Sequence, residues 1–113
     1  MPESSEKIAT NLRKGVLEYC VLALLQDREM YGLEIANELM DRELSASEGS
    51  LYPLLARMKT SGSVDTRWEQ AAGSRSRKYY AITAEGQQQL ATFEAVWNQI
   101  SAQVYGLLGG HHG

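Results

Sequence analysis

The chain has 113 residues and a net charge of −3 at pH 7, a size typical of one domain with a modest hydrophobic core. No apolar run reaches the ~18 residues of a membrane-spanning helix, the N-terminal segment lacks the hydrophobic stretch of a secretory signal, and a single cysteine excludes an internal disulfide framework. We therefore expect a cytoplasmic protein with no membrane partner and no cofactor.

The first helix is predicted over residues 5–26, because large apolar side chains recur there at helical spacing. These side chains are Leu17, Val21, Leu24 and Leu25. Cys20 lies among them and is expected to be a buried hydrophobic residue. Gly15 weakens the middle of this helix by about 1 kcal/mol relative to Ala, which leaves open a bend with residues 5–13 as a separate arm.

A second helix is predicted over residues 31–42, with its apolar residues on one face. This face consists of Ile35, Ala36, Leu39 and Met40. Residues 43–45 are a short connection to a third helix, as in a helix-turn-helix. Ser45 and Glu48 form a capping box at the start of that helix, and Gly62 is placed to end it in a left-handed conformation.

The core face of the third helix repeats at positions i, i+3, i+4 and i+7. It consists of Leu51, Leu54, Leu55 and Met58. Pro53 breaks the pattern, because proline inside a helix removes a hydrogen bond and costs about 3 kcal/mol unless the helix starts late or bends. A broken local rule at this position favours a functional role for the helix.

Two strands follow, joined by a connection over residues 70–76. Val64, Thr66 and Trp68 alternate with polar residues, which predicts a strand with these three side chains on its buried face. Tyr80 and Ile82 repeat the pattern in the returning strand. The connection contains Gly73 and small residues, as expected for the tip of a hairpin.

A long final helix begins after Thr83, which is its expected N-cap, and it contains no Lys or Arg. Its apolar stripe consists of Leu90, Phe93, Val96, Trp97, Ile100, Val104 and Leu107. A wide apolar stripe on an outer helix indicates an interface, so we expect a homodimer. We divide the chain into a DNA-binding domain over residues 5–82, a dimerisation helix over 83–108 and a disordered tail over 109–113.

Basic residues are concentrated between residues 57 and 78, where six cations and two acids give six minus two, a local charge of +4. The cations are Arg57, Lys59, Arg67, Arg75, Arg77 and Lys78. A helix followed by a basic hairpin is typical of the winged helix-turn-helix, in which the helix enters the DNA major groove and the hairpin contacts the backbone. We predict this mainly α, α+β fold, with double-stranded DNA as partner.

Two groups of residues are the candidate DNA contacts. Hydroxyl groups and a glycine at the start of the third helix suit contact with base edges and phosphates: Ser47, Gly49, Ser50 and Tyr52. Cations of the hairpin and of two helices suit phosphates: Arg57, Arg75, Arg77, Lys78, Arg13 and Lys14. Each group also has an alternative, purely structural interpretation. The two serines could be helix caps, the tyrosine could pack at the edge of the core, and the hairpin cations could lie in a solvated turn.

No catalytic or metal site is predicted. The two histidines lie in the tail, at positions 111 and 112, with no third ligand nearby. Ser47 and Ser50 lack a neighbouring base of the triad type, and no glycine-rich phosphate loop follows a strand. We therefore expect a binding protein and not an enzyme.

The segments YGLEIANEL (31–39), SEGSLYPLLARMKTSGSV (47–64) and SRSRKYYAITAEGQQQL (74–90) resemble the PadR-type transcriptional regulators, in order over most of residues 12–108. The resemblance is to the compact branch with one short C-terminal helix. It implies a repressor that dimerises through its C-terminal and N-terminal helices and is released from DNA by a small effector. This chain departs from the family pattern at Ser63 and Val64, where a larger aliphatic pair is usual, so the packing of the hairpin needs explanation.

The resemblance also implies a tentative effector site, because a Trp of the C-terminal helix stacks on flat ligands in a multidrug-sensing branch. The matching residues are Trp97, Phe93, Val96 and Ile100; simple packing of the dimer is the alternative for Trp97. For the whole protein, the leading hypothesis is a homodimeric repressor that binds an inverted-repeat operator. The alternative is a winged-helix protein-interaction module without DNA binding.

Overall fold

The computed structural model describes residues 2–44, 48–70 and 75–109, with side chains at 2–4 and 48 left aside. In chain order the elements are α1 (Pro2–Leu25), β1 (Met30–Tyr31), α2 (Gly32–Asp41), α3 (Glu48–Ser61), β2 (Val64–Gln70), β3 (Ser76–Ile82) and α4 (Ala84–Leu108). The strands form one antiparallel sheet in the order β1-β3-β2. The mainly helical winged-helix class predicted from the sequence is confirmed.

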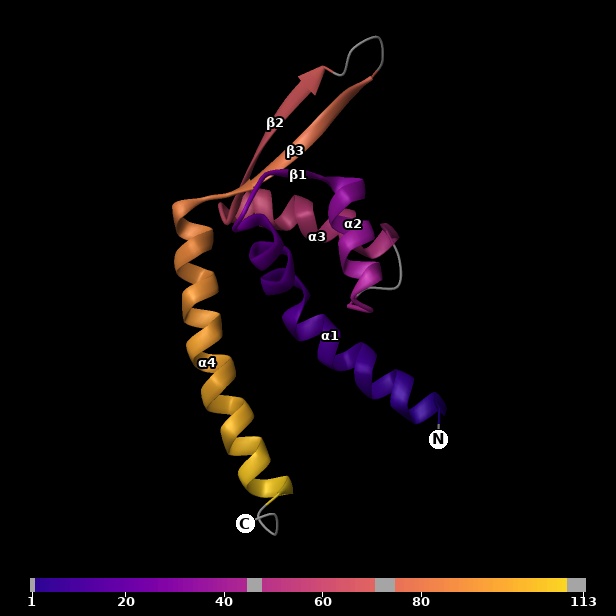
Figure 1. Cartoon of the computed structure of the whole chain (residues 1–113), viewed down its shortest axis with the longest axis vertical. Helices are drawn as coiled ribbons and strands as arrows, with labels where there is room; N and C mark the ends of the chain where they lie inside the picture. The colour runs from indigo at the N-terminus through magenta and orange to yellow at the C-terminus, as the bar shows by residue number, and fades with distance from the viewer. Residues whose placement is uncertain (1, 45–47, 71–74, 110–113) are drawn as a thin grey trace.

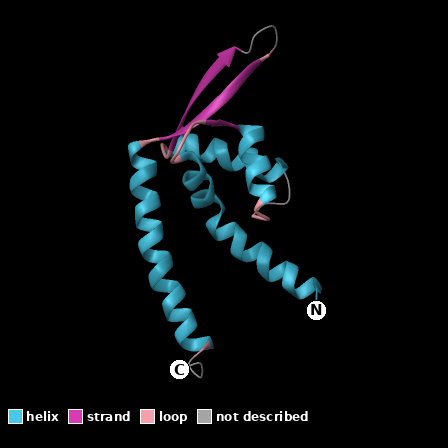
Figure 2. Ribbon diagram, in the orientation of Figure 1, coloured by secondary structure: helices cyan, strands magenta, loops and turns pink. Residues whose placement is uncertain are grey.

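Figures 1 and 2 show how these elements are arranged. α2, α3 and the C-terminal half of α1 pack under the base of the sheet, and the β2–β3 hairpin projects beyond them. α4 and α1 diverge as they run away from the sheet, which leaves both helices with long outer ends (Figure 2). The molecule is elongated for this reason, measuring 61 × 33 × 21 Å along its principal axes.

The core lies where α1, α2, α3 and the sheet meet. Its largest fully buried apolar side chains are Leu22, Met30, Ile35, Leu39, Leu51, Leu55 and Met58. Each stabilises the fold by about 1.5–3 kcal/mol relative to an exposed position. The predicted faces of α2 and α3 are confirmed, except that Met40 is 38% exposed because it lies on the flank of the α2 face, in the last turn.

α1 is helical without interruption from Pro2 to Leu25, and Gly15 lies in its interior. The arm over residues 5–13 is therefore part of this helix, which also begins before the predicted residue 5. Cys20 is only half-buried, in contrast to the prediction, because it packs at the margin of the core and lines a surface concavity. Partial burial raises the pKa of its thiol.

β1 was not predicted. Met30 and Tyr31 pair with Tyr80 and Tyr79 of β3, so α2 begins at Gly32, one residue later than predicted. Glu34 Oε1 accepts a 3.0 Å hydrogen bond from the Tyr31 backbone N–H at the start of this helix. A strand of two residues has no periodicity, and only its pairing with β3 defines it.

The β2–β3 hairpin corrects the prediction for Trp68. Val64 is buried and Thr66 is half-buried, but Trp68 is 67% exposed. The alternation was correct, yet the helical layer covers only the base of the hairpin (Figure 1). Trp68 therefore lies on the same face of β2 as Val64 and Thr66, as predicted, but too far along the hairpin for the helices to bury it.

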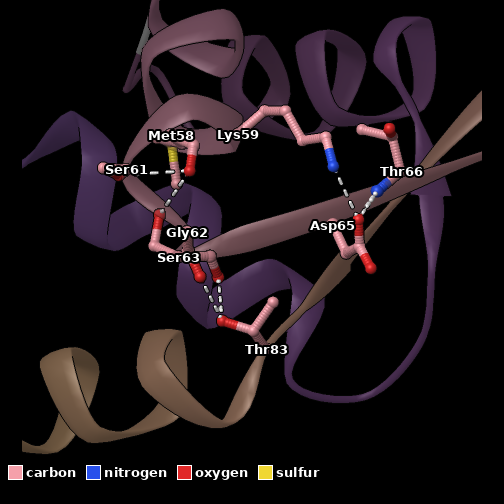
Figure 3. Close-up of polar contacts among 8 residues, drawn as sticks. All are labelled: Met58, Lys59, Ser61, Gly62, Ser63, Asp65, Thr66 and Thr83. Carbon is pink, nitrogen blue, oxygen red and sulfur yellow. Dashed lines mark hydrogen bonds and ion pairs between the residues drawn. The ribbon is translucent and has the colours of Figure 1, made fainter.

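The junction of α3, β2 and α4 is held by backbone groups (Figure 3). Gly62 ends α3 with φ +89°, as predicted, and the Ser63 backbone N–H donates to Met58 O at 3.0 Å. Ser63 is fully buried, with its hydroxyl donating to the same carbonyl at 3.3 Å. Thr83 Oγ1 lies 2.6 Å from Gly62 O and 3.0 Å from Ser63 O, and it accepts from the Gly86 N–H. The predicted N-cap is confirmed.

The Ser63–Val64 pair, which departs from the family pattern, is therefore well packed. The Ser63 side chain is directed to the end of α3, where its hydroxyl donates to Met58 O, and its backbone carbonyl faces α4. Gly86 completes this fit, because a Cβ at Gly86 would overlap the Ser63 carbonyl oxygen and approach Ile82 Cγ1 to 2.9 Å. At the other end of α4, Gly109, which was expected in the tail, is the C-cap and donates to Tyr105 O. Residues 110–113 lie outside the described residues.

Candidate nucleic-acid interface

α3 presents one face to the core and the opposite face to solvent. Because Leu51, Leu55 and Met58 are buried, the helical period places Gly49 and Pro53 on the outer face, where both are exposed. Pro53 lies inside the helix, which begins at Glu48. The backbone carbonyl that loses its partner is four residues earlier, near the exposed N-terminal end, where water can replace the hydrogen bond.

On one side of this outer face, α3 and α1 line a concavity of about 570 Å³. Arg13 and Lys14 of α1 and Arg57 of α3 converge on it, with Ser50 beside them. Within the described part of the chain, none of these three cations has an acidic partner. One acid, Glu18, also lines the concavity, so three cations stand against one carboxylate there. This excess of positive charge favours an anion such as a phosphate.

On the other side of α3 lies the hairpin. Tyr52 of α3, Arg77 and Lys78 of β3 and Trp68 of β2 line a smaller concavity of about 320 Å³. The Arg77 guanidinium lies 4.6 Å from the centre of the Tyr31 ring. Lys78 Nζ lies 5.9 Å from the ring of Trp68 and 5.7 Å from that of Tyr80. The two side chains leave opposite faces of β3, Lys78 on the face of Trp68 and Arg77 on the face of Glu69. These cation–π contacts, worth about 0.5–1 kcal/mol each at exposed sites, hold both cations at the rim of the concavity.

Tyr52 links α3 to the start of α2 and is 43% exposed. A Cβ at Gly32 would lie 2.6 Å from Tyr52 Cε1, so glycine permits this approach. Tyr80 lies nearby, and burial together with the neighbouring Tyr52 raises its pKa. Tyr52 therefore packs at the edge of the core and is also accessible at the surface. Its position agrees with both sequence-based alternatives, a core-edge residue and a DNA contact.

Two of the six predicted basic residues are neutralised within the chain. Lys59 Nζ lies 2.8 Å from Asp65 Oδ1, which also accepts a hydrogen bond from the Thr66 backbone N–H (Figure 3). The Lys59 contact and this hydrogen bond together lower the pKa of the Asp65 carboxyl. Arg67 forms ion pairs with Glu29 at 2.6 Å and Glu69 at 2.8 Å, and these bonds raise its pKa. Fewer cations of this segment are therefore available to a ligand than its six basic residues suggest.

The other predicted residues of the DNA contact surface and of the α3 cap lie at or beyond the limits of the described residues. Arg75 is exposed next to the undescribed connection, and no ion pair involves it among the described residues. Ser47 and Ser45 lie outside the described residues. The structure thus brings Arg13, Lys14 and Arg57 together on one side of α3 and places Arg77 and Lys78 on the other.

A third concave surface lies between α1 and α4 and has a volume of about 590 Å³. All four tentative effector residues line it, with α1 residues opposite: Phe93, Val96, Trp97, Ile100, Leu12, Val16 and Tyr19. Phe93 stacks on Tyr19 of the same chain with ring centres 4.3 Å apart, and on Trp97 at 5.8 Å. Trp97 and Ile100 remain 48% and 50% exposed, so the groove is open and apolar.

Over the described ranges, no helix is both long and apolar enough to cross a membrane. The same ranges contain no cluster of three or more His, Cys, Asp or Glu side chains able to hold a metal ion. The histidines at 111 and 112 lie outside them.

Residues 21–92, more than half of the chain, match the transcriptional regulator PadR-like family. The chain belongs to this family. A PadR family transcriptional regulator from Eggerthella lenta is 32% identical, with a TM-score of 0.87 over 95% of this chain and 94% of its own. A PadR-like transcriptional regulator from Bacillus cereus is 37% identical, with a TM-score of 0.77 over 87% of this chain and 96% of its own.

The PadR of Bacillus subtilis, whose structure was solved in complex with operator DNA, is 27% identical with a TM-score of 0.64. The similarity covers 69% of this chain but only 46% of that one, so the present PadR-like chain matches less than half of the larger protein. The family consists of transcriptional regulators and not of enzymes, in agreement with the sequence analysis.

Proposed function

We propose that this PadR-like regulator is a repressor that binds operator DNA as a homodimer. The outer face of α3 enters the major groove, and the cations on either side of α3 contact the flanking phosphates. The observation that carries this proposal is the distribution of charge. Cations without acidic partners among the described residues flank α3, whereas Lys59 and Arg67 are neutralised.

A second copy of the chain is the proposed occupant of the apolar groove between α1 and α4. α4 exposes Val96, Trp97, Ile100 and Val104, while Leu12 of α1 is 65% exposed. An apolar face of this extent is costly to leave in water. A two-fold axis along this groove would present two α3 helices symmetrically, so the operator would be an inverted repeat with half-sites separated by one or more helical turns.

The proposed site of a small aromatic effector is the apolar pore that Trp97 and its symmetry mate would line where two such grooves meet in the dimer. Phe93 and Trp97 offer flat ring faces in a volume of about 590 Å³, which suits stacking on planar compounds. The effector releases DNA only if it binds the DNA-incompetent form of the dimer more tightly than the competent form.

The alternative function, a protein-interaction module without DNA binding, is less well supported. Such a module has no need for cations kept apart from acids on both sides of one helix. The following measurement distinguishes the two functions.

Replacing Arg57 and Arg77 together by alanine should weaken binding to any duplex. The slope of the logarithm of the binding constant against that of salt concentration should fall by about two units, one for each lost phosphate contact. Fluorescence anisotropy with a labelled random-sequence duplex at several salt concentrations measures both quantities.

The matched control replaces Arg28 and Arg42, two exposed arginines paired with Glu34 and Glu38. This control removes the same charge away from α3, and its salt slope should stay close to that of the unchanged protein. Equal slopes for all three proteins would rule out the proposed phosphate contacts, and absence of duplex binding at low salt would favour the protein-interaction module.

Planar aromatic compounds should quench the Trp fluorescence of the protein in a saturable way. Trp97→Ala should abolish this quenching, because the indole supplies the stacking surface, whereas Trp68→Phe should retain it. A dye titration followed by emission, with sedimentation to verify the oligomeric state, tests this prediction. If no compound in a broad aromatic panel gives saturable quenching, Trp97 only packs the dimer.

A further inference from the structure

The exposed indole of Trp68 stands out on the hairpin. Its 67% exposure exceeds that of Trp97, although tryptophan is among the most costly side chains to leave in water. Trp68 lines the open 320 Å³ concavity beside Tyr52, and Lys78 Nζ lies 5.9 Å from its ring centre. Packing within the described chain therefore does not account for a large aromatic residue at this position.

The strand register shows which way the indole faces. Thr66 is paired with Tyr80 and Trp68 with Lys78, and residues two apart on a strand share a face. Tyr80 is buried against the helices, so Trp68 lies on the face of the hairpin that looks toward the helical layer. Tyr52 of α3 lines the same 320 Å³ concavity, which places the indole on the side of the proposed recognition helix.

The two faces of the hairpin differ in charge. On the opposite face, Arg67 is bound between Glu29 and Glu69, and Arg77 lies across the ladder from Glu69, so two acids offset the two cations there. On the Trp68 face, Lys78 lies between the Trp68 and Tyr80 rings, and no ion pair with an acid involves it in the described chain. Charge complementarity therefore selects the Trp68 face for a polyanion.

We propose that Trp68 is a DNA-contact residue of the hairpin, and this inference rests on the proposed function. Its ring packs against a deoxyribose next to the α3 site, and its Nε1–H donates a hydrogen bond to a backbone phosphate that Lys78 also contacts. Indole combines a flat apolar surface with one N–H donor, which matches the apolar sugar and anionic phosphate of the backbone. The contact fixes the position of the hairpin and carries no base specificity.

The test measures binding of a labelled random-sequence duplex at low salt by anisotropy. Trp68→Ala should weaken binding roughly tenfold, equivalent to about 1.4 kcal/mol, and Trp68→Phe should weaken it less because the flat ring remains. Neither variant changes charge, so the salt slope should stay constant, unlike that of the arginine variants. DNA should also shift or quench the protein emission, and Trp68→Phe should remove most of that response.

Tyr105→Ala is the matched control, because Tyr105 is an exposed aromatic residue near the far end of α4, at 71% exposure. Its DNA affinity should equal that of the unchanged protein. Thermal unfolding followed by circular dichroism should show both Trp68 variants folded, since the side chain contributes little buried surface.

Three results would overturn the assignment. If the unchanged protein binds duplex and Trp68→Ala binds equally well, the indole does not contact DNA, although the proposed function stands. If the unchanged protein binds no duplex, both proposals fall. If Trp68 emission instead depends on protein concentration without DNA, the indole contacts a second copy of the chain.

Discussion

Changing Ile100 and Val104 of α4 together to Glu is expected to convert the regulator from a dimer into a monomer. Ile100 lines the α1–α4 groove, and Val104 follows it one turn later on the same face of α4. The two side chains are 50% and 43% exposed in the single chain. Burying two carboxylates in an apolar interface without partners costs several kcal/mol. Dimer affinity should therefore fall at least a hundredfold, equivalent to about 3 kcal/mol, as measured by sedimentation at micromolar concentration.

The matched control introduces the same two charges at Asn98 and Ala102, with the same spacing but on the opposite side of α4. This control should remain dimeric. Operator affinity should fall in the first variant and persist in the second, because two half-sites are bound only by a dimer. A monomeric unchanged protein, or equal behaviour of the two variants, would refute the interface.

Gly86→Ala should destabilise the fold by about 3 kcal/mol, although Ala is otherwise the better helix former. The added Cβ would overlap the Ser63 carbonyl oxygen, which is a rigid backbone group held by the Thr83 N–H at 3.1 Å. α4 must move away from the Gly62–Ser63 turn to relieve this overlap, and the movement weakens the Thr83 contacts. Urea unfolding at one fixed protein concentration measures the loss.

Gly106→Ala is the control within the same helix. A Cβ at Gly106 would have no neighbour within 4 Å, so this variant should be unchanged or more stable by about 0.5–1 kcal/mol. Opposite effects of one substitution at two positions would show that Gly86 is required for close packing. A Gly86→Ala protein as stable as the original would show that the α4–β2 junction adapts easily.

Local periodicity and capping chemistry were sufficient for most of the fold. The apolar stripe of α3, the left-handed Gly62 and the Thr83 N-cap depend on residues within one or two helical turns of each other. The four effector candidates follow the same rule, since spacings of three and four place Phe93, Trp97 and Ile100 on one face of α4. The sequence therefore predicted which side chains share a surface.

What lies opposite such a surface depends on residues far apart in the chain. Arg67 was counted in the local charge of +4, but the turn before β1 brings Glu29, 38 residues away, within 2.7 Å of its Nε. Trp68 alternates like a core residue, but its exposure depends on where the helical layer ends. Sequence by itself determined the helices, the two hairpin strands and their faces, because these follow from backbone geometry and nearby side chains, whereas β1 exists only through its pairing with β3. Only the tertiary structure decided which charges are neutralised and which apolar faces are covered, because both depend on three-dimensional packing.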